Sequence, residues 1–219
     1  MGSLNINLAN SIIELHPSRA AFWIGGKTLF LSDLHLGKAE SYQSQGVPLP
    51  SGGSQLDLSK IKELFDFYHP EELWILGDFI HSKNGLSQIQ LLETFAALLT
   101  ESKVKAKIIL GNHDRPLRGY IPESLRTEYI EFVDDFIETE DFICSHDDLP
   151  MATKPVISGH IHPVIKIRSG FDSLRLPCFL RSSHGVLLPA FSSLAGGFEI
   201  TPKRGDEVYV VAGDSILKL

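Results

Sequence analysis

The chain has 219 residues and a formal net charge of −7 at pH 7. That length suits a single domain spanning residues 1–219, and 43% hydrophobic against 21% charged residues provides a core and excludes a globally disordered chain. The acidic balance argues against a protein that coats nucleic acid or membranes through net charge, although it leaves room for a local basic rim around a site.

The targeting and redox signals predict a cytoplasmic protein with no membrane partner. No basic start followed by a long apolar run opens the sequence, and no stretch approaches the ~20 apolar residues that a membrane span needs. The two cysteines, Cys144 and Cys178, are too few for a disulfide framework and favour a reducing compartment.

The first half of the chain alternates between strand and helix patterns. Strands are expected at residues 12–15, 20–24, 28–32, 72–76 and 107–110, and helices at 55–68 and 87–99. Gly25-Gly26 predicts a hairpin turn, residues 46–54 predict an ordered loop or flap, and Ser54 is expected to cap the first helix. The βαβαβ order predicts a parallel sheet with right-handed crossovers.

The second half consists of brief strand patterns separated by turn residues. They lie at residues 129–133, 136–138, 142–145, 156–158, 164–167, 178–181, 185–188 and 207–211. This change of pattern favours a layered α/β sandwich with two sheets.

Five segments place polar, metal-competent residues at or near the end of an apolar strand. They contain Asp33 and His35; Asp78 and His81; Asn112, His113 and Asp114; His146; and His160 and His162. Ligands gather beyond the carboxyl ends of strands in α/β sheets, so these side chains are expected to converge.

Each segment also has an ordinary structural explanation. A lone Asp-x-His is a common strand terminus, and Gly-Asp is ordinary turn chemistry. The paired imidazoles of Gly159-His160-Ile161-His162 are hard to explain without a metal, and the five segments in order predict a metal site. His16, His69 and His184 lie beside Pro, Ser or Gly in expected turns and are interpreted as surface residues.

The donor types indicate which metals and which chemistry to expect. Carboxylate and amide oxygens with imidazoles suit Mn²⁺, Fe or Zn²⁺, with Mg²⁺ also possible. Two divalent ions, offset in part by Asp33, Asp78 and a bridging hydroxide, would keep positive charge for a phosphate anion and would activate water for attack. The sequence has no Gly-x-Ser-x-Gly elbow and no P-loop, so covalent serine catalysis and P-loop nucleotide hydrolysis are not expected.

The ordered motif set resembles the calcineurin-like metallophosphoesterase superfamily. The matching residues, from about residue 28 to 167, are Asp33-x-His35, Gly77-Asp78, Gly111-Asn112-His113-Asp114, His146 and Gly159-His160-x-His162. The resemblance implies a four-layer α/β/β/α sandwich with two central mixed sheets. It also implies one metal held by Asp33, His35 and His162, a second held by Asn112, His146 and His160, and Asp78 as the bridge. His113 would protonate the leaving oxygen or stabilise the phosphoryl oxygens.

One position departs from that family pattern. Many members have an acidic residue shortly after the bridging Asp that orients the catalytic histidine, whereas this chain has His81. Asp114, Asp147 or Asp148 could take over as the outer-shell partner. His81 is expected either to contact the substrate phosphate, as an imidazolium at mildly acidic pH, or to pack as a loop histidine.

Longer segments narrow the resemblance to one subfamily. SDLHLGKAESYQSQGVPLP, GDFIHS, SGHIHP, RLPCFL and LPAFSSLAGG are similar to the DNA-ligase-associated metallophosphoesterases, which are linked with the DNA damage response. This similarity implies a Mn²⁺-dependent phosphodiesterase or endonuclease acting on DNA, with a repair ligase, nuclease and helicase as functional associates.

The sequence leaves other functions open. A small-molecule phosphodiesterase or pyrophosphatase, a phosphomonoesterase and an inactive scaffold would use the same fold, although a scaffold would be expected to have lost ligands or His113. Diester cleavage is expected to exceed monoester cleavage. The basic residues Lys38, Lys83, Arg115 and Arg118 would suit a nucleic-acid backbone or be ordinary surface, and Arg115 is the substrate-binding candidate nearest the metals.

Overall fold

The computed structural model describes residues 2–47, 52–81, 88–169 and 172–219. Within these residues, one sheet has seven strands in the order β1-β2-β3-β4-β5-β6-β7. The strands are β1 Leu4–Leu8, β2 Ser11–His16, β3 Ala20–Trp23, β4 Thr28–Leu31, β5 Glu72–Leu76, β6 Lys105–Ile109 and β7 Ile130–Val133. Strands β1 to β4 pair antiparallel and β4 to β7 pair parallel, which confirms the predicted hairpin and parallel crossovers.

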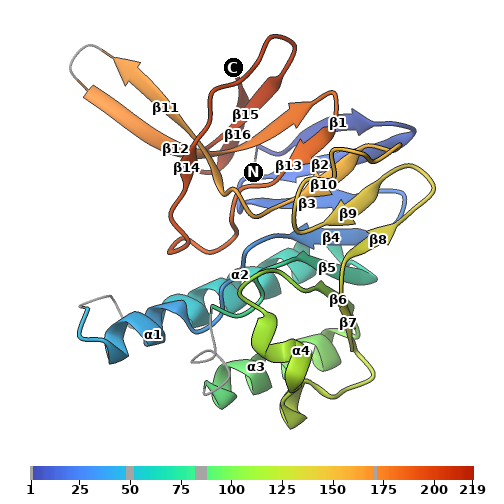
Figure 1. Cartoon of the computed structure of the whole chain (residues 1–219), viewed down its shortest axis with the longest axis vertical. Helices are drawn as coiled ribbons and strands as arrows, with labels where there is room; N and C mark the ends of the chain where they lie inside the picture. Colours follow the sequence, from blue (N-terminus) through green and yellow to red (C-terminus); the bar gives the residue numbers. More distant parts are fainter. Residues whose placement is uncertain (1, 48–51, 82–87, 170–171) are drawn as a thin grey trace.

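Two helices cover one face of this sheet (Figure 1). They are α2 Gly53–Tyr68 and α3 Ile89–Ser102; the shorter helices are α1 Lys38–Ser44, α4 Arg115–Gly119 and a 3₁₀ turn at Glu123–Leu125. Leu58, Ile61 and Leu64 of α2 recur at helical spacing and pack in one core with Leu31 and Ile75 of the sheet. No described helix is both long and apolar enough to cross a membrane.

The second sheet has nine strands among the described residues. They are β8 Phe136–Glu138, β9 Ile143–Ser145, β10 Val156–Ser158, β11 Pro163–Ser169, β12 Asp172–Ser182, β13 Gly185–Leu187, β14 Phe198–Glu199, β15 Glu207–Ala212 and β16 Ser215–Lys218. Both parallel and antiparallel pairs occur in it, for example β9 with β10 and β12 with β15. The chain is therefore α/β with two mixed sheets, as predicted.

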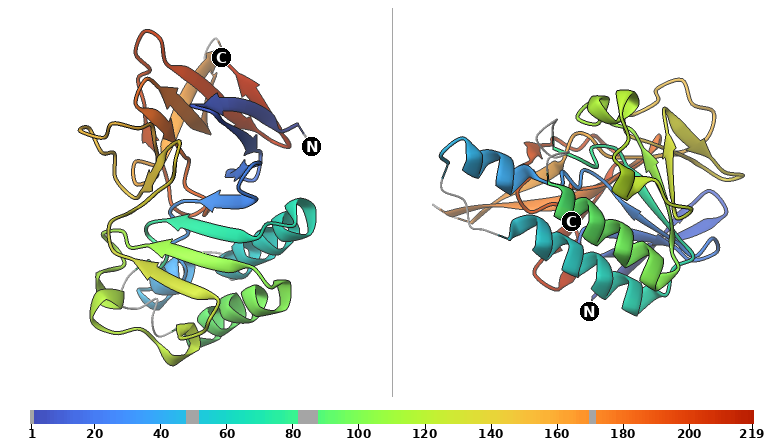
Figure 2. Two further views of the ribbon diagram at one scale, coloured as in Figure 1. Left: turned by 90° about the vertical axis from the view of Figure 1, so that its right-hand side faces the viewer. Right: turned by 90° about the horizontal axis from the view of Figure 1, so that it is seen from below.

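The two sheets pack face to face and the helices lie outside the first (Figure 2). Phe30 and Trp74 of the first sheet share a core with Phe142 and Phe179 of the second. Helices α1 to α4 all lie on the first sheet's side (Figure 1). On the second sheet's outer face, in the described part of the chain, strands and loops pack around Cys178, where the family resemblance implied a further helical layer.

Some local predictions differ from the structure. Strands β1 and β16 and helix α1 were not expected, and α2 begins at Gly53, two residues early. Ser54 makes no side-chain cap for α2; its Oγ accepts from the Gly37 amide at 3.2 Å and donates to Glu40 at 2.9 Å, tying α1 to α2. Residues 48–51 of the expected loop lie outside the described residues.

His16 is buried, which corrects its interpretation as a surface residue. Only 3% of it is exposed, because it ends β2 on the face covered by the last turn of α2, where its ring contacts Phe67 and Tyr68. Burial lowers the pKa of His16. His69 and His184 are exposed, as expected.

Candidate metal centre

The polar loops that follow β4 and β5 run side by side beyond the strand ends. The Asp33 amide donates to the Gly77 carbonyl at 3.2 Å, and the His35 amide donates to the Asp78 carbonyl at 2.8 Å. The His81 amide in turn donates to Leu36 at 3.0 Å. The parallel pairing of the strands thus extends into the loops and fixes the spacing between the two motifs.

The loop residues expected to bind metal adopt unusual backbone conformations. The residues are Asp33, His35, Asp78, His160 and His162, with φ of 53°, 47°, 49°, 70° and 52°. Positive φ is sparsely populated for non-glycine residues and costs of order 1–3 kcal/mol each. This concentration of strain at the strand ends is typical of a functional site.

Four of the predicted residues form a first donor set. The ligand atoms of Asp33, His35, Asp78 and His162 all lie within 4.8 Å of one another. His162 Nε2 is 3.2 Å from Asp33 Oδ1, and His35 Nε2 is 3.8 Å from Asp78 Oδ2. Neither Nε2 atom has a hydrogen-bond partner, although both are buried.

A second donor set adjoins the first through Asp78. Asp78, His146 and His160 have ligand atoms within 4.8 Å of one another. His146 Nε2 lies 3.0 Å from both Asn112 Oδ1 and His160 Nδ1, and 3.6 Å from Asp78 Oδ1. His146 Nδ1 lies 3.2 Å from the Leu76 carbonyl, the acceptor for an Nδ1–H that leaves Nε2 free as a ligand.

The donor chemistry fits divalent cations. Asp33 and Asp78 are almost completely buried. Burial raises the pKa of Asp78, and burial together with the nearby Lys38 and three histidines lowers the pKa of His35 to about 2. Buried carboxylates beside buried imidazole nitrogens that lack hydrogen-bond partners form a donor set that a divalent cation would satisfy.

Glycines before the candidate ligands leave room for them. A Cβ on Gly77 would lie 1.9 Å from His146 Nδ1, and a Cβ on Gly111 would lie 2.3 Å from Asp78 Oδ1. Any side chain at either position would displace a candidate ligand. The glycine in the Gly-Asp and Gly-Asn-His-Asp motifs is therefore a packing requirement of the site.

Asp114 holds the loops together instead of contacting the His113 ring. Its buried carboxylate accepts from the backbone amides of Phe79, Ile80 and Gly111 at 2.9–3.0 Å. Asp147 lies by a different histidine, with Oδ1 3.7 Å from His160 Nε2, and Asp148 is exposed. No carboxylate in the described residues is thus bonded to the His113 ring, although the His113 backbone amide donates to Asp78 Oδ1 at 2.9 Å.

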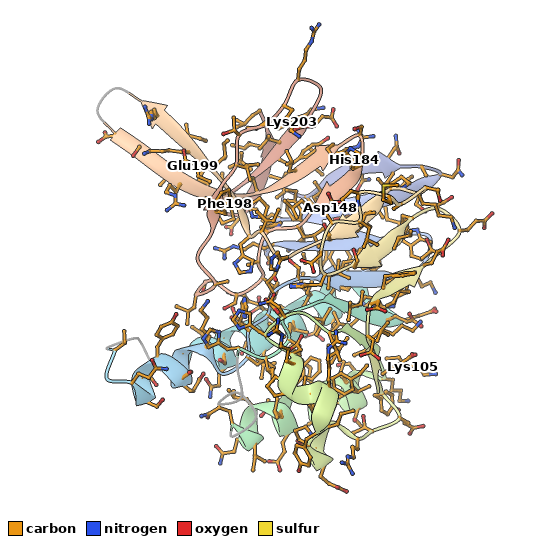
Figure 3. The ribbon with its side chains drawn as sticks, in the orientation of Figure 1. Lys105, Asp148, His184, Phe198, Glu199 and Lys203 are labelled. Carbon is orange, nitrogen blue, oxygen red and sulfur yellow. The ribbon has the colours of Figure 1, made fainter. Side chains whose placement is uncertain are left out.

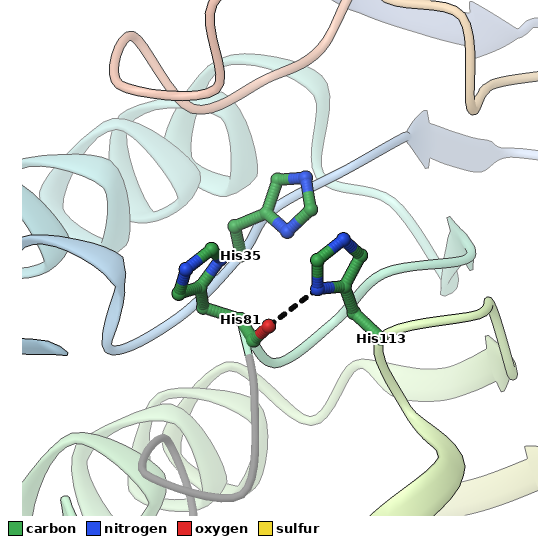
Figure 4. A group of neighbouring side chains, drawn as sticks. All are labelled: His35, His81 and His113. Atoms are coloured by element: carbon green, nitrogen blue, oxygen red, sulfur yellow. Dashed lines mark hydrogen bonds between the residues drawn. The ribbon is translucent and has the colours of Figure 1, made fainter.

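The partner of His113 is a backbone carbonyl (Figure 4). His113 Nδ1 donates to the His81 carbonyl at 2.5 Å. The two rings stack with centroids 5.3 Å apart and an interplanar angle of 19°, and the Tyr42 ring also stacks with the His81 ring, with centroids 5.7 Å apart. Burial, Lys38 and His113 lower the pKa of His81 to about 4, so an imidazolium at mildly acidic pH is not expected.

The basic residues expected near the site separate in the structure. Lys38 Nζ donates to the Ala195 carbonyl at 3.4 Å, and His162 Nδ1 lies 3.3 Å from the same oxygen. Arg118 is paired with Asp134 at 3.1 Å, and Arg115 is exposed. Lys83 lies outside the described residues.

Several of these contacts had no signal in the sequence. The Leu76, His81 and Ala195 carbonyls are backbone atoms that any residue type provides, so only the fold reveals them as histidine partners. Tyr42 could have been anticipated only by expecting helix α1.

Comparison with known proteins identifies the family. Residues 26–177 match the family model for calcineurin-like phosphoesterases. The chain belongs to this family. As a calcineurin-like phosphoesterase it is a metal-dependent phosphoester hydrolase.

One solved structure shows the same fold over the whole chain. A crystal structure of the Pseudomonas putida nuclease MPE superposes on this calcineurin-like phosphoesterase with a TM-score of 0.82 and 30% identity, covering 100% of both chains. A protein of unknown function from Aquifex aeolicus, AQ665, matches at 21% identity and a TM-score of 0.42, covering 62% of this chain and 78% of its own. No curated protein sequence matches.

Proposed function

We propose that this phosphoesterase uses two divalent metals to cleave phosphodiesters of nucleic acid. The observation that carries the two-metal part is the position of Asp78. One of its oxygens lies near His35 and the other near His146, so a single carboxylate belongs to both donor sets. Asp33, His35 and His162 would hold one ion, and Asn112, His146 and His160 the other.

Support for nucleic acid as the substrate comes from the comparison. The Pseudomonas putida neighbour is a nuclease, and the likeness to it extends over the whole chain. Mn²⁺ is the metal we propose first. A DNA-repair role, an association with ligase, nuclease or helicase, and a cytoplasmic location stay predictions from the subfamily resemblance.

The chain's own residues then have distinct roles. When bound, the metals would supply an activated water and positive charge for the phosphoryl oxygens. His113 donates its Nδ1 proton to the His81 carbonyl, so a proton for the leaving oxygen would come from Nε2 of the doubly protonated ring. Lys38, held at Ala195, places a cation next to the donor set for a non-bridging phosphate oxygen.

Charge balance favours a diester over a monoester. Two divalent ions with Asp33, Asp78 and one hydroxide retain about one positive charge, which matches a diester monoanion. A monoester dianion would need further fixed cations; Lys38 is one, whereas Arg118 is engaged by Asp134.

The test uses protein stripped of metal and reloaded with Mn²⁺. We expect a higher kcat/KM for bis-p-nitrophenyl phosphate than for p-nitrophenyl phosphate, and nicking of single- or double-stranded DNA. A clear monoester preference without any DNA cleavage would refute the proposal in favour of a phosphomonoesterase. Cleavage of small diesters alone would favour a small-molecule phosphodiesterase or pyrophosphatase.

A further inference from the structure

Strands β11 and β12 form a hairpin that projects from the body of the molecule (Figure 1). Figure 2 shows that it extends on the same side as α1. Its first residue, Pro163, directly follows His162 of the first donor set. We call this hairpin, Pro163–Ser169 with Asp172–Ser182, the arm.

One face of the arm is cationic. Lys166 is the register partner of Arg175, and Arg168 lies two residues further along the same strand, so the three side chains project from one face. We call these three residues the cationic face. Among the described residues, neither Lys166 nor Arg168 forms an ion pair.

Acidic residues do not cancel this charge. Glu199, the register partner of Val164, lies on the same face at the root of the arm, where Figure 3 labels it beside Phe198. Asp172 alternates with Ser173 and therefore lies on the opposite face. The cationic face keeps a net positive charge in a chain whose formal charge is −7.

The cationic face connects to the metal centre through one short segment. Arg175 Nη2 donates to the Gly197 carbonyl at 2.9 Å. Two residues earlier, the Ala195 carbonyl accepts from Lys38 and lies 3.3 Å from His162 Nδ1. The Phe198 amide donates to the His162 carbonyl at 3.0 Å. Cations thus border the segment 195–198 from the metal centre outward to the arm.

We propose that the cationic face binds the phosphates of a nucleic-acid chain whose scissile phosphate lies at the metal centre. The inference rests on the proposed function and adds how a long substrate is held. A polyphosphate chain fits because the cations extend outward from the catalytic site: Lys38 lies at the donor set, Arg175 and Lys166 lie side by side on the arm, and Arg168 lies further out. Such a row of cations is what binding along a nucleic-acid backbone requires.

The opposite face of the arm suggests a different partner, and the experiment must distinguish that partner from nucleic acid. Ile167 and Leu174 are register partners there and are 37% and 58% exposed. An arm with one cationic and one apolar face could instead dock on an anionic lipid surface. The cationic track, unlike the apolar pair, leads to the donor set, so nucleic acid is favoured.

Charge reversal on the arm tests the proposal. In Lys166→Glu/Arg168→Glu, we expect KM for a labelled oligonucleotide to rise about tenfold or more, because two phosphate contacts become repulsive. The slope of log KM against log salt should fall by about 1.4, from ~0.7 for each lost contact to a single strand. The kcat/KM for bis-p-nitrophenyl phosphate should stay within about twofold, since a small diester does not reach the arm.

The matched control is Lys103→Glu/Lys105→Glu, which reverses two exposed lysines with the same spacing. Figure 3 shows Lys105 on the far side of the molecule from the arm root. Lys166→Gln/Arg168→Gln, which removes charge without reversing it, should shift KM in the same direction by a smaller factor.

The outcomes separate this inference from the proposed function. Wild-type protein that hydrolyses bis-p-nitrophenyl phosphate but cleaves no nucleic acid would refute both. Wild-type nuclease activity with equal KM in the arm and control variants would refute the arm alone. If the arm variant loses binding to phosphatidylglycerol vesicles while its oligonucleotide KM is unchanged, the arm binds lipid. If its kcat/KM for bis-p-nitrophenyl phosphate falls as much as that for the oligonucleotide, the substitutions damage the metal centre.

Discussion

At the scale of single residues, two side chains in the centre have separable tasks. Asp78 directs one carboxylate oxygen toward each donor set, whereas the His113 ring is held by the His81 carbonyl and belongs to neither the four-residue nor the three-residue set around Asp78. Metal affinity and proton transfer should therefore respond to different substitutions.

Asp78→Asn should release both metals, because the shared ligand loses its charge and one donor oxygen. His113→Ala should leave two metals bound and lower kcat by ~10²–10⁴-fold, the usual contribution of general acid catalysis. Metal analysis and steady-state kinetics on the same preparations measure both effects. A His113→Ala protein that has lost a metal would place His113 among the ligands.

His81→Ala separates the role of the His81 ring, which the substitution removes, from that of the His81 carbonyl, which it keeps. The backbone oxygen that holds His113 survives the substitution and only the stacked ring is lost, so kcat should fall less than in His113→Ala, by about tenfold at most. Because the pKa of His81 is lowered to about 4, KM of the variant relative to wild type should not change between pH 8 and about 6. A KM ratio that grows as the pH falls toward 6 would restore the imidazolium interpretation.

At the scale of elements, the site is made by the ends of parallel strands. The hydrogen bonds between the Asp33 and Asp78 loops continue the ladder of β4 and β5, and the Asp114 carboxylate fastens the β5 loop to the β6 loop. Strand-end motifs could be recognised in sequence because their residue types carry the chemistry. The backbone partners could not, because they depend on how neighbouring loops meet.

Gly111→Ala tests how tightly these loops pack. Its Cβ would lie 2.3 Å from Asp78 Oδ1 and 2.5 Å from the Asp78 amide, so we expect a loss of about 1–3 kcal/mol in unfolding free energy together with weaker metal binding. Gly119→Ala is the matched control, because nothing lies within 4 Å of its added Cβ. Urea unfolding and metal titration compare them, and equal metal affinity in the two variants would contradict the packing account.

At the scale of the whole molecule, two sheets and one helical layer bring distant parts of the chain to one place. The βαβαβ period predicted the parallel half of the first sheet, and the short strands predicted the second sheet. Strand β1 and helix α1 were missed because each is short and stabilised by tertiary contacts, β1 by pairing with β2 and α1 by the bond from Ser54 to Glu40. His16 was misplaced for the same reason, since its burial comes from α2 packing over β2.

The proposed mechanism depends on a pair of metals that share Asp78. Anomalous diffraction from crystals of the Mn²⁺-loaded protein tests it most directly. We expect two peaks separated by ~3.5–4 Å, with Asp78 between them, as in two-metal hydrolases. A single peak in fully active protein, or two peaks with Asp78 bound to only one, would contradict it.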